Sequence, residues 1–247
     1  MAAKAKPFGV CKLCGQEREL CGSHIIPEFC YKSMYDDKGR ARAIHTHMEC
    51  WRQQGYKEPL LCEPCDNRLN RDYEQPFHKF WYGNVLTMGS AMDEYVMVRG
   101  FQYDWMKLFH LSVLWRCHVS KQFGSTTILG PYGDIIRRML LAGDPGAEDY
   151  LTIAGCMLLD NKRFVMDRFV SYPQVHTDEQ SLFYVMQYAG CEWYFLMTDD
   201  LSQKLTQFKL HGIHADGSMM LMTKPYQRSY GFGEAGRTGR ARKGPRH

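Results

Sequence analysis

Two Cys-x-x-Cys pairs constrain the fold of this chain more than any other feature of its sequence. The first pair is Cys11 and Cys14, and the second is Cys62 and Cys65. Four thiolates in two such pairs are typical of a closed tetrahedral zinc site, in which the metal stabilises a unit that has only a small apolar core. The sequence therefore predicts one structural Zn²⁺ in the first part of the chain, bound by these four cysteines.

The remaining cysteines leave other ligand sets open. Seven of the ten cysteines lie within the first 65 residues, and the 47 residues between Cys14 and Cys62 exceed the usual spacing of a zinc ribbon. One ligand could therefore be replaced by Cys21, Cys30 or Cys50. The N-terminus has no hydrophobic export signal, so the pattern favours metal over disulfides and we expect a cytoplasmic protein.

Composition and charge indicate a globular body with a basic tail. The chain is 45% apolar and 13% aromatic, and no apolar run approaches the roughly 18 residues that a membrane helix needs, so no membrane partner is expected. Although the net charge is +4, the last residues alone carry +5. Basic residues interleaved with Gly suit sequence-independent contact with nucleic acid, although the tail could simply be a solubilising end. The basic residues are Arg237, Arg240, Arg242, Lys243 and Arg246.

Periodicity divides the chain into a zinc-binding unit at 1–83, an α+β region at 84–229 and a disordered tail at 230–247. Cys65, Leu69 and Tyr73 recur every four residues, which predicts a helix that opens at the second cysteine pair and ends at Pro76. In the second part we expect helices followed by antiparallel strands, and hence an α+β fold. The expected helices are 104–120 and 133–142, and the expected strands are 95–101, 151–159, 163–171, 182–188, 191–198 and 218–223. Turns between strands are expected at Asn161-Lys162 and at Ala189-Gly190.

The segment Ser23-His24-Ile25-Ile26-Pro27 lies between the cysteine pairs, and Asp66 follows the last cysteine. With these motifs, roughly the first 75 residues resemble the zinc-containing HNH (ββα-metal) endonucleases. The resemblance implies a treble-clef zinc unit in which His24 activates a water for attack on a phosphodiester. We expect the substrate to be DNA rather than RNA. It also implies one catalytic divalent cation, Mg²⁺ or Mn²⁺, at the scissile phosphate. Small HNH proteins often act as effector subunits in antiphage systems, so this role is an expectation here too.

The resemblance further implies Asp66 as a ligand of the catalytic metal, and Asn70, one helical turn later, could add a second ligand. Two features depart from the family pattern. Ser23 replaces the aspartate that usually coordinates the metal, and no asparagine lies between His24 and Cys62. The orienting role of that asparagine could fall to His45, His47, Gln53 or Gln54.

Plainer interpretations stand beside these. His24 could be a packed core histidine, and Asp66 could serve only to stabilise the first turn of a helix. The alternative function is a zinc-stabilised nucleic-acid-binding or assembly module whose nuclease site has degenerated. In a third interpretation, the region after residue 83 binds a protein or ligand and controls the N-terminal unit.

Overall fold

The structure is a computed structural model that describes residues 6–45, 48–52, 55–88, 94–177, 182–197 and 209–230, with only the backbone described at 41–45, 48–52 and 177. Apart from Tyr230, the predicted disordered tail lies outside these ranges, and so do its five basic residues from Arg237 to Arg246. Their interpretation stays a prediction.

The N-terminal sheet carries the first cysteine pair. It consists of β1 (Phe8–Val10), β2 (Glu17–His24) and β5 (Lys57–Cys62), all antiparallel and in the order β1-β2-β5. Cys11 and Cys14 lie in the tight turn between β1 and β2. Gly15 closes this turn with a φ of 76° and donates its N–H to the carbonyl of Cys11 at 2.9 Å. A residue with a side chain rarely adopts that left-handed conformation, which explains the glycine.

The helix that opens at the second cysteine pair does not end at Pro76, so that prediction is wrong. It begins as α1 (Glu63–Leu69) and continues through η2 (Asn70–Glu74), α2 (Gln75–Phe80) and η3 (Trp81–Val85). The elements η2 and η3 are π-helical turns, and the N–H of Gln75 bonds to the carbonyl of Asn70, five residues earlier. A proline lacks its own N–H and disturbs the preceding turn of an α-helix. The wider π-turn directly before Pro76 accommodates both effects.

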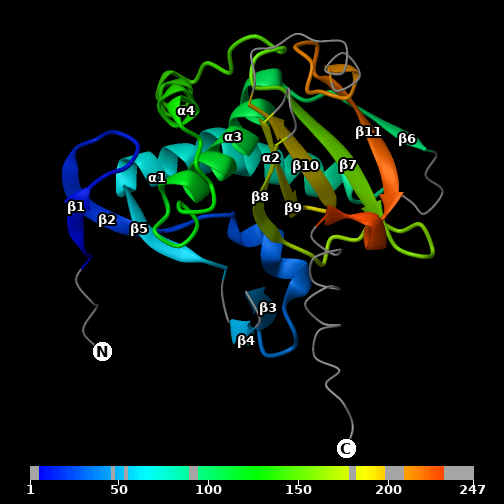
Figure 1. Ribbon diagram of the computed structural model, residues 1–247, viewed down its shortest axis with the longest axis horizontal. Helices are drawn as coiled ribbons and strands as arrows, with labels where there is room; N and C mark the ends of the chain where they lie inside the picture. The colour runs from blue at the N-terminus through cyan, green and yellow to red at the C-terminus, as the bar shows by residue number, and fades with distance from the viewer. Residues whose placement is uncertain are drawn as a thin grey trace, which may run out of the picture.

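Two smaller elements lie between β2 and β5. The 3₁₀ helix η1 (Glu28–Met34) follows Pro27 directly. Strands β3 (Ala41–His45) and β4 (Met48–Arg52) then form an antiparallel hairpin that projects from the body of the protein (Figure 1).

The C-terminal part contains a six-stranded mixed sheet in the order β6-β11-β7-β10-β9-β8, in which only β11 and β7 pair in parallel. Together with the helices, this sheet makes the fold α+β, as expected. Ala189 and Gly190 both have positive φ, 52° and 74°, and form the predicted turn between β9 and β10. The strands are β6 (Tyr95–Arg99), β7 (Ile153–Leu159), β8 (Ser171–Thr177), β9 (Leu182–Tyr188), β10 (Cys191–Leu196) and β11 (Ser218–Pro225).

The strand predicted at 163–171 is wrong except for its last residue, because β8 begins at Ser171. The carboxylate of Asp160 accepts the N–H groups of Lys162 and Phe164 at 2.8 and 2.9 Å. Such local bonds hold the backbone in a turn and compete with strand pairing. Val165 consequently makes only an isolated bridge to Leu159.

Helix α3 (Tyr103–Val119) joins the two parts of the chain, and α4 (Pro131–Ala142) packs beside it (Figure 1). Every residue of α3 from Met106 to Cys117 is buried, including the charged Lys107 and Arg116. Its Phe109 ring stacks on Phe77 of α2 at a centroid distance of 3.8 Å. On the sheet side, the ring of His110 lies 4.0 Å from that of Trp193 in β10. Within the described residues, no helix is long and apolar enough to cross a membrane.

Candidate functional site

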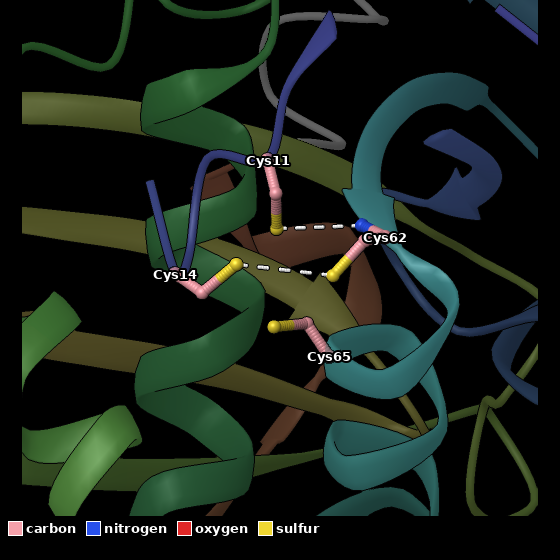
Figure 2. Close-up of side chains that lie close together, drawn as sticks. All are labelled: Cys11, Cys14, Cys62 and Cys65. Atoms are coloured by element: carbon pink, nitrogen blue, oxygen red, sulfur yellow. Dashed lines mark hydrogen bonds between the residues drawn. The ribbon is translucent and has the colours of Figure 1, made fainter. Parts of the chain in front are cut away.

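The four predicted cysteines come together at the N-terminal sheet. Their Sγ atoms all lie within 4.8 Å of one another and point toward a common centre (Figure 2). Zn–S bonds of about 2.3 Å in a tetrahedron place neighbouring sulfurs about 3.8 Å apart. The sulfurs of Cys14 and Cys62 are 3.8 Å apart. This donor set fits a metal such as zinc, and the nine cysteines with described side chains form no disulfide.

The surroundings of Cys11 favour its ionised form. Burial alone would raise the pKa of its thiol, but backbone N–H groups of Cys14, Cys62 and Leu13 lower that pKa to about 7. One of these donors, the N–H of Cys62, lies 3.3 Å from the sulfur of Cys11. Metal ligation requires thiolates, and these N–H groups favour the thiolate of Cys11. Without a metal, burial raises the pKa of the Cys62 and Cys65 thiols instead.

The alternative cysteine ligands are not part of this cluster. Cys21 and Cys30 both lie outside the group whose sulfurs converge. Cys30 is fully buried, and this burial raises its thiol pKa far above the ordinary value. A buried neutral thiol behaves as a small apolar side chain. The side chain of Cys50 lies outside the described residues.

A cavity of about 640 Å³ lies where β2 ends beside the long helix. His24, the last residue of β2, lines it, and so do Asp66 and Asn70. From Asp66 onward, residues four apart along the helix recur in the cavity wall, the next two being Glu74 and His78. Residues at that spacing share one face of a helix. The fold thus brings the predicted base and both predicted metal ligands to one cavity.

The imidazole of His24 faces Glu28, the first residue of η1. Its Nε2 lies 2.6 Å from a carboxylate oxygen of Glu28, although the angle is not that of a well-formed hydrogen bond. Burial lowers the pKa of His24, as do the positive charges of Lys57 and Arg116, whereas Glu28 raises it. The net effect is a pKa below the ordinary 6.5, so the ring is mostly neutral at pH 7 and can accept a proton.

Sequence reasoning missed two acidic residues of this cavity, Glu28 and Glu74. Arg116 of α3 is buried, forms an ion pair with Glu74 at 2.7 Å and donates a hydrogen bond to the backbone carbonyl of His24 at 2.8 Å. An arginine in an otherwise apolar helix was a visible signal for such a contact. Its partners were not, because 42 and 92 residues separate them from Arg116.

Ser23 is buried, its hydroxyl has no hydrogen-bond partner among the described residues, and it does not line the cavity. Within the same residues, only the four cysteines form a group of three or more His, Cys, Asp or Glu ligand atoms close enough to share an ion. Asp66 and its neighbours therefore form no closed metal cage. Four side chains were candidates for the orienting role of the missing asparagine, and all lie outside the described part of the structure. They are those of His45, His47, Gln53 and Gln54.

Comparison with known proteins adds no relative. The chain matches no model of a protein family, no curated protein and no solved structure.

Proposed function

We propose that this chain is a metal-dependent endonuclease of the HNH type, which hydrolyses phosphodiester bonds in nucleic acid, DNA before RNA. The supporting observation is that His24, Asp66 and Asn70 line one cavity beside the cysteine cluster. In this proposal the cysteines hold a structural zinc in a treble-clef unit, and the chemistry occurs in the cavity. The basic tail provides additional contacts with phosphate groups.

His24 acts as the general base. Its neutral imidazole removes a proton from a water molecule, whose oxygen forms a bond to phosphorus as the bond to the departing ester oxygen breaks. The lowered pKa of His24 supports this role, because the base has to be unprotonated before the reaction. Cations at the cavity wall attract the phosphate backbone electrostatically. They are Lys32 and Lys79.

A divalent cation, Mg²⁺ or Mn²⁺, would be held by Asp66 and Asn70. When bound, such an ion neutralises charge on the scissile phosphate and on the departing oxygen. Mg²⁺ sites at phosphates commonly use one or two carboxylates and complete their shell with water and substrate oxygens. An incomplete set of protein donors fits such a site, since a closed cage would leave no position for the substrate.

The test compares wild type with His24→Ala and Asp66→Ala on plasmid, linear DNA and RNA, in Mg²⁺, in Mn²⁺ and without divalent metal. His24→Ala should abolish cleavage, and Asp66→Ala should reduce it with partial rescue at higher metal concentration. His214→Ala is the matched control, because His214 lies outside the cavity. Zinc content and circular dichroism should be equal in all four proteins.

Cleavage that persists in His24→Ala would disprove the role of His24 as base. Because an effector of an antiphage system can be silent alone, the assay should be repeated with proteins encoded beside this one. Such partners would act through the region after residue 83.

A second candidate function is a zinc-stabilised nucleic-acid-binding or assembly module without catalysis. Two observations favour it: the described residues form no closed second metal cage, and Ser23 is buried and does not line the cavity. DNA binding without cleavage, under every metal and partner condition, would support this candidate over the nuclease.

A further inference from the structure

Glu28 is held in place by two separate parts of the chain. The hydroxyl of Tyr35, just after η1, donates to one carboxylate oxygen at 2.5 Å. The N–H of Gly55, just before β5, donates to the other oxygen at 3.3 Å. A carboxylate bound from two sides has few alternative positions, so its orientation is set before any substrate arrives.

The fixed carboxylate lies against the imidazole of His24. Pro27, with a φ of −53° and a ψ of 143°, ends the extended segment after β2 and starts η1, which brings Glu28 back beside His24. The buried Nε2 of His24 has no other hydrogen-bond partner among the described residues. Its 2.6 Å contact with Glu28 is imperfectly aligned. Catalytic hydrogen bonds are often poorly aligned without substrate and tighten when substrate binds.

We propose that Glu28 is the positioning residue of His24: its carboxylate holds the ring by the Nε2–H and leaves Nδ1 free to take the proton of the water. This inference rests on the proposed function of the cavity. A base held by a third group in this way is a general arrangement in catalysis, because the third group sets the orientation and tautomer of the ring. The same carboxylate stabilises the imidazolium that forms when the proton is transferred.

The charges around His24 make Glu28 the group that keeps the ring basic. Lys57 from β5 and Arg116 from α3 both lower the pKa of His24 by their positive charge, in addition to the effect of burial. Glu28 acts in the opposite direction, through its charge and its contact with the ring. Further charged or titratable groups line the same cavity, and their charges also influence the pKa measured for His24. They are Lys32, Asp66, Glu74, His78 and Lys79.

The contact can be tested without relying on nuclease activity. The pKa of His24 is measured by NMR titration of its ring Cε1–H in the full-length, zinc-loaded protein, without added Mg²⁺ or Mn²⁺. The signal is assigned by its loss in His24→Ala. Glu28→Gln preserves shape but removes the charge, so the pKa of His24 should fall. The matched control is Glu19→Gln, which removes an equal charge away from the ring. Glu19 is an exposed residue of β2, the strand that ends at His24.

Cleavage provides the second readout. Glu28→Ala should lower kcat by about a hundredfold or more with little change of KM, because the base loses its orientation while the DNA contacts remain. Tyr35→Phe, which removes one of the two donors to Glu28, should have a smaller effect in the same direction.

Two results would overturn the proposal. One is a His24 pKa that moves no more in Glu28→Gln than in Glu19→Gln. The other is an unchanged kcat in Glu28→Ala. If the wild type cleaves nothing, the proposed nuclease function fails by itself, and the titration alone then decides whether Glu28 holds His24.

Discussion

Arg116 and Glu74 form a buried ion pair, 2.7 Å between Nη1 and Oε1, that connects α3 to the π-helical turn η2. The arginine side chain is only 3% exposed, and the same Nη1 also donates to the carbonyl of His24. Its Nε points to the carbonyl of Ser112, one turn earlier on α3. Arg116 thus ties α3 to two elements of the N-terminal part: the end of β2 at His24 and the long helix at Glu74.

Removing one member of this pair should be costly. Arg116→Met leaves the buried carboxylate of Glu74 without its charge partner and the carbonyl of His24 without its donor, so we expect a loss of about 3–5 kcal/mol in the free energy of unfolding. The measurement is urea unfolding followed by circular dichroism. Arg71→Met is the matched control, because Arg71 pairs with Asp72 at 2.6 Å but is 71% exposed. An exposed pair contributes only about 0–1 kcal/mol. Equal losses in the two variants would contradict a structural role for the buried pair.

Metal removal should unfold the N-terminal sheet. We expect nearly one zinc per chain by elemental analysis, and Cys62→Ser should lose both the metal and the structure around β2 and β5. Cys21→Ser is the control, because Cys21 lies on the same sheet but outside the cluster. A structural zinc contributes directly to folding free energy, so a chelator should produce the same unfolding as Cys62→Ser. Zinc-free protein that keeps its fold would refute this prediction.

Local patterns explain what the sequence predicted correctly. The two cysteine pairs needed only their own spacing to suggest a shared metal. The alternation of the strands and the turn at Ala189 and Gly190 likewise depend on neighbouring residues. The α+β class follows from such signals, since each element carries its own periodicity.

The features that were missed depend on contacts between distant residues or on competing local bonds. Pro76 stops a regular α-helix but not one that widens into a π-turn directly before it. Hydrogen bonds from backbone N–H groups to the carboxylate of Asp160 favour a turn over the start of the strand that was predicted at 163–171. Glu74 became visible as a partner only when Arg116 was placed beside it. The two residues lie on different helices, so no periodic pattern in the sequence predicts that contact.

The basic tail should contribute to nucleic-acid affinity in a salt-dependent way. Replacing its five basic residues with Gln keeps the length of the chain but removes the charges that displace counterions from the phosphates. The slope of log K against log salt should then become shallower by up to about 4.5, if all five residues contact phosphate in duplex DNA. Fluorescence anisotropy with labelled DNA across a salt series measures this slope. A slope equal to that of the wild type would show that the tail makes no phosphate contact. The replaced residues are Arg237, Arg240, Arg242, Lys243 and Arg246.

His110, buried in the middle of α3, should make the folded protein sensitive to acid. Its Nδ1 lies 2.6 Å from the hydroxyl of Tyr188, and burial holds the pKa of His110 well below 6.5. Below pH 6.5 the unfolded chain therefore binds a proton at this residue that the folded chain does not bind. The contribution of neutral His110 to the free energy of unfolding is therefore fully present above pH 6.5. Below that pH, the free energy of unfolding falls by about 1.4 kcal/mol per pH unit.

The test for His110 is the variant His110→Asn, whose side-chain oxygen can accept the hydroxyl of Tyr188 but cannot be protonated in this range. Urea unfolding between pH 5 and 7 should give a pH dependence that is weaker in the variant than in the wild type by about one proton. His214→Asn is the matched control, because its ring is partly exposed and pairs with Glu148 at the surface. The same acid sensitivity in wild type and His110→Asn would mean that His110 is not the group responsible, and that its pKa is not held low by burial.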